Sequence, residues 1–119
     1  MALRVLVCGG RFYDDYKKVV GTLNNIWREC SQMVLIHGCA KGADTLADEW
    51  SKNAWLFDVA VERYPANWNK FGKSAGYIRN KQMLDDGKPE LVVAFPGGVG
   101  TRMMIDLAKK ANVEVLQIE

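Results

Sequence analysis

An α/β domain built around a parallel five-stranded sheet is the architecture that this 119-residue sequence predicts. Short apolar runs alternate with longer segments whose apolar residues recur at helical spacing, as in consecutive βα units. The short runs are almost continuously apolar, which indicates strands that are buried on both faces of the sheet. The hydrophobic fraction of 49% and the aromatic fraction of 10% are globular values and exclude a disordered chain.

The elements follow one another along the chain with little between them. Five runs have the length and composition of buried strands: residues 4–8, 33–36, 59–64, 91–95 and 113–118. Four segments have the i, i+3, i+4, i+7 apolar spacing of amphipathic helices: residues 16–30, 43–54, 75–85 and 103–111. Asp14 or Asp15 stands where the first helix needs its N-cap. Residues 66–74 have neither pattern and predict an irregular segment.

The order of these elements restricts the topology. Right-handed crossovers between parallel strands make a three-layer, Rossmann-like sheet of order 3-2-1-4-5 the expected arrangement. The length suits a single hydrophobic core, so we expect one domain over residues 1–119. Ligands of such sheets bind at the carboxyl ends of the strands near the switch point. The expected crevice therefore lies between the first and the fourth strands.

Composition and charge exclude several classes of protein. The 16 Lys and Arg residues against 14 Asp and Glu give a net charge of +2, with no basic stripe, so nucleic acid is not the expected partner. No apolar stretch has the length of a membrane span, and the first residues are too short for a signal peptide. The three Cys form no CxxC and the chain has one His. We expect a cytoplasmic domain with reduced thiols and without a metal or cofactor.

Glycine is concentrated in three of the four strand-to-helix loops, at residues 9–11, 38–44 and 96–101. These loops follow the first, second and fourth strands, which the predicted order makes neighbours, so they should converge on one rim of the sheet. Glycine allows close backbone approach, and the helix N-termini behind the loops attract phosphate. The alternative is that the glycines only form tight turns. Arg11 and Lys41 within the loops favour an anion site.

An anion site at this rim predicts a set of ligand-binding residues. Arg79 on the third helix either clamps a phosphate or carboxylate at the crevice or pairs on the surface with Asp85 or Asp86. The residues expected to bind the ligand or its phosphate are Gly9, Gly10, Arg11, Gly38, Lys41, Gly42, Asp44, Arg79, Asn80, Pro96, Gly97, Gly98, Gly100 and Thr101.

Several other residues have two interpretations each. Trp68 and Phe71 either pack over a sheet edge or form a lid that stacks on a base. His37 ends a strand and is expected to be satisfied by backbone groups rather than to act in catalysis. Cys8 and Cys39 are expected to be small apolar fillers rather than nucleophiles.

Four motifs in this order resemble the SLOG superfamily, and the whole chain is similar to its small YspA-like branch. They are Val-Cys-Gly-Gly-Arg-Phe-Tyr-Asp at 7–14, Gly-Cys-Ala-Lys-Gly-Ala-Asp at 38–44, Tyr-Pro-Ala-Asn-Trp at 64–68, and Pro-Gly-Gly-Val-Gly-Thr at 96–101 behind an Arg-Asn-x-x-Met helix at 79–83. The resemblance implies a site for a nucleotide or a nucleotide-derived ligand, with the Pro-Gly-Gly-x-Gly-Thr loop cradling phosphate.

The same resemblance leaves the activity open. The distantly related cytokinin-activating phosphoribohydrolases have PGGxGTxxE, and Met104 stands where that motif has Glu. Asp106 lies roughly 200° further around the helix and is expected to point elsewhere. A hydrolase of nucleoside 5′-monophosphates is therefore the alternative to a binding module. The catalytic candidates would be Arg79, Asp44 and Asp14. Trp55 and Leu56 could form a contact between two copies.

Overall fold

The computed structural model describes residues 2–53 and 58–119. Its sheet has five parallel strands in the order β3-β2-β1-β4-β5, which confirms the predicted topology. The strands are β1 (Leu3–Cys8), β2 (Met33–His37), β3 (Val59–Arg63), β4 (Leu91–Ala94) and β5 (Glu114–Gln117). The long helices are α1 (Tyr16–Cys30), α2 (Ala43–Asn53), α4 (Ala75–Gly87) and α5 (Val99–Lys110). Trp55 and Leu56, the predicted contact between copies, lie outside the described residues.

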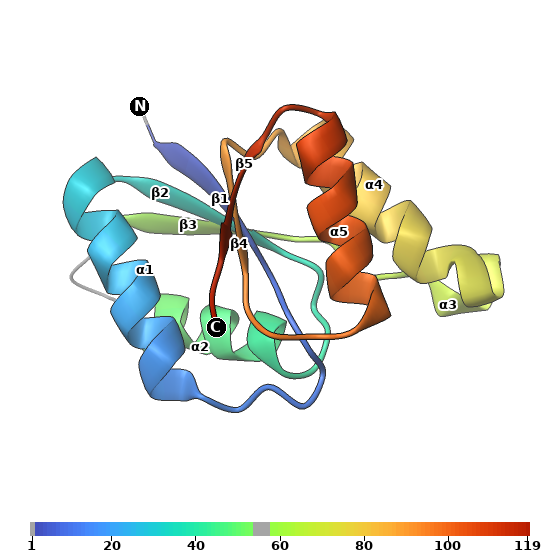
Figure 1. Ribbon diagram of the computed structural model, residues 1–119, viewed down its shortest axis with the longest axis horizontal. Helices are drawn as coiled ribbons and strands as arrows, with labels where there is room; N and C mark the ends of the chain where they lie inside the picture. Colours follow the sequence, from blue (N-terminus) through green and yellow to red (C-terminus); the bar gives the residue numbers. More distant parts are fainter. Residues whose placement is uncertain (1, 54–57) are drawn as a thin grey trace.

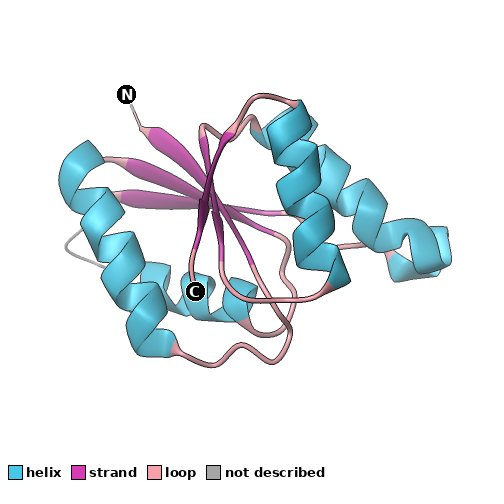
Figure 2. Cartoon of the chain, viewed as in Figure 1, coloured by secondary structure: helices cyan, strands magenta, loops and turns pink. Residues whose placement is uncertain are grey.

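The helices form two layers, one on each face of the sheet. Helices α1 and α2 pack together on one face and α4 and α5 on the other (Figure 1, Figure 2). Alternate residues of β1 supply the two cores: Val5 and Val7 contact the first layer, and Leu6 and Cys8 contact the second. This placement of both cores against one central strand is why the strands are continuously apolar.

Two predicted boundaries need correction. Within the segment 66–74, which was predicted to be irregular, residues 68–74 are helical: α3 (Trp68–Phe71) is followed by the 3₁₀ helix η1 (Gly72–Ser74). The Asn67 side chain accepts a hydrogen bond of 3.1 Å from Lys70 N and caps α3. A single turn is too short to show an apolar period, so the sequence pattern missed it. Helix α5 begins at Val99, four residues before its first expected position. The apolar pattern missed its first turn, because Val99, Gly100 and Arg102 are exposed there.

The N-cap prediction for α1 is confirmed at Asp15, whose carboxylate accepts a hydrogen bond of 3.1 Å from Lys18 N. This bond satisfies one of the N–H groups that the first turn leaves without an intrahelical partner. The loop before this cap follows the carboxyl end of β1, so it lies at that end of the sheet (Figure 1).

Candidate functional site

The three glycine-rich loops meet at one rim of the sheet. Gly10 is their common point: its N–H donates to the Pro96 carbonyl oxygen at 2.9 Å, and its own carbonyl accepts from Ala43 N at 3.2 Å. These two hydrogen bonds join the loop after β1 to the loops after β4 and β2. The predicted convergence of the loops is therefore present in the fold, because the strands that they follow are adjacent.

Close packing accounts for glycine at most of the predicted positions. A Cβ on Gly42 would lie 2.0 Å from the Gly10 carbonyl oxygen, and one on Gly97 would lie 2.2 Å from Thr101 Oγ1. A Cβ on Gly9 would lie 2.6 Å from that of Ala43. Distances below about 3 Å are not possible without movement, so the loops can meet only where side chains are absent.

Gly98 and Gly100 differ from these glycines. A Cβ at either position would have no atom of another part of the chain within 4 Å. Gly98 has a φ of −104°, so it does not have the positive φ that favours glycine. Packing thus gives no reason for glycine at these two places, whereas the approach of a ligand to the backbone would give one.

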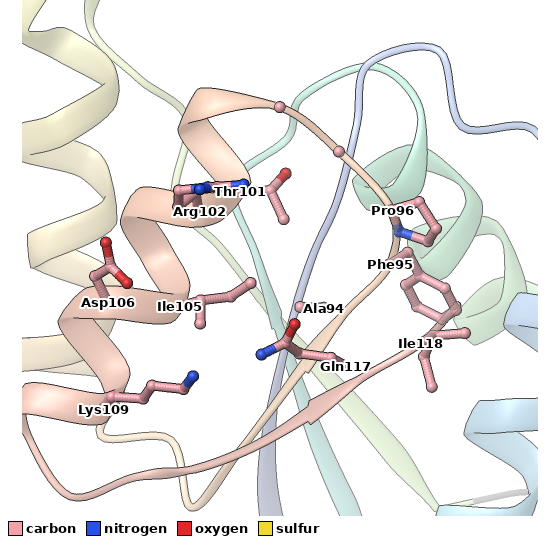
Figure 3. Close-up of a pocket in the computed structure, with 12 residues that line it drawn as sticks. Ala94, Phe95, Pro96, Thr101, Arg102, Ile105, Asp106, Lys109, Gln117 and Ile118 are labelled. Atoms are coloured by element: carbon pink, nitrogen blue, oxygen red, sulfur yellow. The ribbon is translucent and has the colours of Figure 1, made fainter.

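A cavity of about 350 Å³ lies beside this open part of the loop (Figure 3). It is bounded by the β4–α5 loop, one face of α5 and the end of β5. At the junction of β1 and β4, where the sequence predicts the crevice, Gly10 and Pro96 are in direct contact, and the cavity lies beside them along the β4–α5 loop. The lining residues are Ala94, Phe95, Pro96, Gly97, Gly98, Thr101, Arg102, Ile105, Asp106, Lys109, Gln117 and Ile118.

The N-terminus of α5 faces the cavity without a side-chain cap. Its first N–H groups carry the positive end of the helix dipole. Arg102 and Lys109 add two cations to the lining, and Asp106 adds one carboxylate. Asp106 was expected to point away from the site; it does point away from Met104 but lies on this cavity (Figure 3). The lining therefore has an excess of positive charge.

Asp44 lies inside the protein rather than in the cavity. It is 6% exposed, and its Oδ2 accepts hydrogen bonds from Gly38 N at 3.0 Å and from Ala40 N at 3.2 Å. Burial raises the pKa of this carboxyl, while the N–H of Ala40, His37, Arg79 and the N–H of Gly38 act in the opposite direction. The carboxylate closes the β2–α2 loop, and this contact is structural whether or not a ligand binds.

Arg79 holds α4 against the same loop. Its guanidinium donates to the Gly38 carbonyl oxygen through Nη1 and to Asn80 Oδ1 through Nε at 2.9 Å. A Cβ on Gly38 would overlap this guanidinium, so the Arg79 contact requires glycine at position 38. The alternative surface pair with Asp85 or Asp86 is not formed, because the guanidinium is bonded to Gly38 and Asn80; Asp85 pairs with Lys81 at 3.1 Å. Neither interpretation of Arg79 had included a bond to backbone.

Because of these bonds, we expect Arg79→Ala to lower the free energy of unfolding by about 1–3 kcal/mol, the cost of leaving partly buried acceptors unpaired. Urea unfolding of Arg79→Ala should be compared with that of Arg28→Ala. Arg28 is exposed on α1 and donates only to Asn25 Oδ1. Equal midpoints for the two variants would contradict this role of Arg79.

Of the remaining predicted site residues, one is buried and three are exposed to solvent. Asn80 is 6% exposed, and its amide nitrogen lies 3.8 Å from Met103 Sδ, so it supports the Arg79 contact from within the core. Arg11, Lys41 and Asp14 are exposed at the rim. These three side chains are available to a ligand, but the structure does not bring them into the cavity lining.

A charged network that the sequence analysis missed lies beside Asp44, one helical turn further along α2. Asp48 Oδ1 is 2.8 Å from His37 Nε2 and 2.8 Å from Arg63 Nε, and its Oδ2 is 3.3 Å from Lys52 Nζ. His37 Nδ1 accepts from Cys39 N at 3.0 Å, so His37 donates to Asp48 through Nε2. Although burial acts against it, these hydrogen bonds lower the pKa of Asp48 to about 2. The i, i+4 spacing of Asp44, Asp48 and Lys52 places the three side chains on one face of α2, and this spacing could have indicated the network from the sequence.

The two rim cysteines are unlike each other. Cys8 is buried in the second core, as predicted, and burial followed by the Asp44 charge raises the pKa of its thiol to about 12. Cys39 is exposed, so its prediction as an apolar filler is wrong. The remaining burial of its thiol and the nearby Asp44 raise its pKa as well. Neither environment favours a thiolate nucleophile.

Two aromatic residues predicted at the rim lie elsewhere. Trp68 and Phe71 belong to α3, which packs against the start of α4 at the outer end of that helix layer (Figure 1). The Trp68 ring lies over Gly76, where a Cβ would be 3.5 Å from Trp68 Cη2, and the residue is 51% exposed. They therefore pack on a helix, not over a sheet edge.

Met104 is 1% exposed and belongs to the core between the sheet and the α4–α5 layer. A carboxylate at this position would have to be buried without a partner. Among residues 2–53 and 58–119, no His, Cys, Asp and Glu side chains form a group of three that could hold a metal ion. No helix in the same described part of the chain has both the length and the apolar character needed to cross a membrane.

Comparison with known proteins places the chain in a family. The model of the YspA, cpYpsA-related SLOG family matches residues 3–71, which include the loops after β1 and β2. The Gene 61 protein of Mycobacterium phage D29 is 38% identical over 121 residues, covering 95% of this chain and 94% of that protein. The resemblance read from the four motifs is thereby confirmed: this chain belongs to the YspA, cpYpsA-related SLOG family.

Proposed function

We propose that this protein binds a nucleotide or a nucleotide-derived ligand, with the phosphate at the N-terminus of α5. Membership of the SLOG family suggests a nucleotide-related function of the Rossmann-like type. The observation that carries the proposal is the contrast among the rim glycines. Gly98 and Gly100 have open space where the others are filled by protein, and they begin an uncapped helix beside a cavity.

The charges around the cavity support an anion rather than a neutral ligand. The helix dipole and the N–H groups of the first turn act together on a phosphate. Arg102 and Lys109 are exposed and line the same cavity, so they can reach an anion without giving up a partner in the core. Thr101 is 8% exposed, and its hydroxyl lies against Gly97, which holds the loop in place.

A hydrolase acting on nucleoside 5′-monophosphates is the second candidate, and it requires a carboxyl group near the ligand. Asp106 is the carboxylate on the cavity. Asp44 already accepts two backbone N–H bonds in the protein interior, and Asp14 lies on the exposed rim. We therefore place binding first and retain turnover as an outcome of the test.

The test uses Gly98→Ala. Isothermal titration should show binding of at least one of AMP, GMP, CMP and UMP to the unchanged protein. A methyl group at position 98 should weaken that binding by at least about tenfold, the value of one hydrogen bond to a charged group. The fold should be unaffected, because a Cβ at position 98 meets nothing within 4 Å and φ is negative.

Gly76→Ala is the matched control, since a Cβ there makes only an ordinary contact with Trp68 and lies on α4. It should bind the same nucleotide as tightly as the unchanged protein. The proposal is wrong if none of the four nucleotides binds, or if Gly98→Ala binds as well as Gly76→Ala. Release of free base during the same incubations would establish the hydrolase.

A further inference from the structure

Phe12 is an apolar side chain that the fold leaves in solvent. It is 96% exposed, whereas the next residue, Tyr13, packs its ring against Phe95 with the centroids 5.3 Å apart. The exposed phenyl ring contributes nothing to the core, so it is free to contact another molecule. A planar apolar group held at the rim of a ligand site is suited to contact the ligand.

The ring is carried by a fixed turn rather than by a loose loop. Tyr13 N donates to the Gly10 carbonyl oxygen at 3.2 Å, which makes Gly10 to Tyr13 a hydrogen-bonded turn with Phe12 at its third position. Both ends of this turn are anchored. Gly10 is bonded to Pro96 and Ala43, and Tyr13 is held by its contact with Phe95. Little conformational freedom would be lost when a ligand meets the ring.

The turn stands next to the loop that bears the proposed phosphate site. A Cβ on Gly10 would lie 3.1 Å from the Gly97 Cα, and Gly97 and Gly98 both line the cavity. Phe12 follows Gly10 by two residues, and two residues of extended chain span at most about 7 Å. The ring is therefore within the length of a nucleotide from the start of α5.

We propose that Phe12 is the stacking platform for the base of the bound nucleotide, so that the site selects base-bearing nucleotides over bare sugar phosphates. This inference rests on the proposed function. It assigns to Phe12 the stacking role that the sequence had suggested for Trp68 and Phe71, which lie on α3 at the outer end of α4 (Figure 1). Any base has a flat apolar face, so stacking gives class selectivity without selecting one base.

The test compares AMP with ribose 5-phosphate, which shares the sugar and the phosphate but has no base. Phe12→Ala should weaken AMP binding by about 5- to 150-fold, the range for loss of one base–aromatic stack. Binding of ribose 5-phosphate should not change. Phe12→Trp should keep AMP binding, and Phe12→Leu should lose it like Phe12→Ala, because leucine is apolar but has no planar face.

Each of the other outcomes contradicts either the proposed phosphate site or the stacking role of Phe12. If the unchanged protein binds none of AMP, GMP, CMP, UMP and ribose 5-phosphate, the proposed phosphate site itself fails. If it binds AMP and Phe12→Ala or Phe12→Leu binds AMP equally well, the site stands and the stacking role is wrong. If Phe12→Ala weakens both ligands alike, Phe12 shapes the loop and does not contact the base. If Phe12→Ala only converts a dimer to a monomer in size-exclusion chromatography, the ring is a contact between copies.

Discussion

Gly42→Ala should lower the free energy of unfolding by about 2–6 kcal/mol, from backbone strain and overpacking together. Gly42 has a φ of +82°, a conformation that residues with a Cβ rarely adopt. The new Cβ would also lie 2.0 Å from the Gly10 carbonyl oxygen and 2.7 Å from the Arg11 carbonyl carbon. All these atoms are backbone, so no side-chain rotation can relieve the overlap, and the β1 and β2 loops would have to separate.

Urea denaturation followed by far-UV circular dichroism measures this loss. The matched control is Gly21→Ala on α1, where a Cβ would meet nothing within 4 Å. That change should leave stability unaltered or raise it by about 0.5–1 kcal/mol, because alanine favours a helix over glycine. A midpoint for Gly42→Ala as high as that for Gly21→Ala would show that the loops do not depend on this contact.

Asp48→Ala should lower the free energy of unfolding by about 1–3 kcal/mol, the usual cost of leaving a buried hydrogen-bond donor without its acceptor. The Asp48 side chain is 14% exposed and His37 is 3% exposed, so water cannot easily replace the lost acceptor. Arg63 and Lys52 would lose the same carboxylate. The matched control is Asp85→Ala, whose exposed pair with Lys81 contributes at most about 0.5 kcal/mol.

The Asp48 carboxylate also makes the free energy of unfolding depend on pH. Its pKa in the folded protein is about 2, below the ordinary value of 3.8, so the ionised form stabilises the fold. That contribution is fully present above about pH 4 and is lost as the pH falls towards about 2; it amounts to about 2 kcal/mol. Asp48→Asn should unfold with a weaker pH dependence over this window. Parallel curves for Asp48→Asn and the unchanged protein would rule out this contribution.

Local patterns in the sequence determined the sheet, its order and the rim. An apolar run or a helical stripe shows which face of a strand or helix is buried, and the spacing of apolar residues along the chain is enough to recognise it. The same reasoning put Cys8 in the core and placed the cap of α1 at Asp14 or Asp15, of which the structure shows Asp15. It also identified the family, because the motifs at 7–14, 38–44, 64–68 and 96–101 stand in the order of the YspA-like branch.

Only the tertiary structure decided which rim residues are free. Gly42 and Gly98 are both glycines in strand-to-helix loops, yet one is enclosed by backbone and the other is open. The bond from Arg79 to Gly38 and the pairing of His37 with Asp48 join separate elements. Such contacts depend on how helices cross the sheet and how far each loop reaches, and no periodicity within one element records that distance. The same reason applies to the cavity, whose lining combines the β4–α5 loop, α5 and the end of β5.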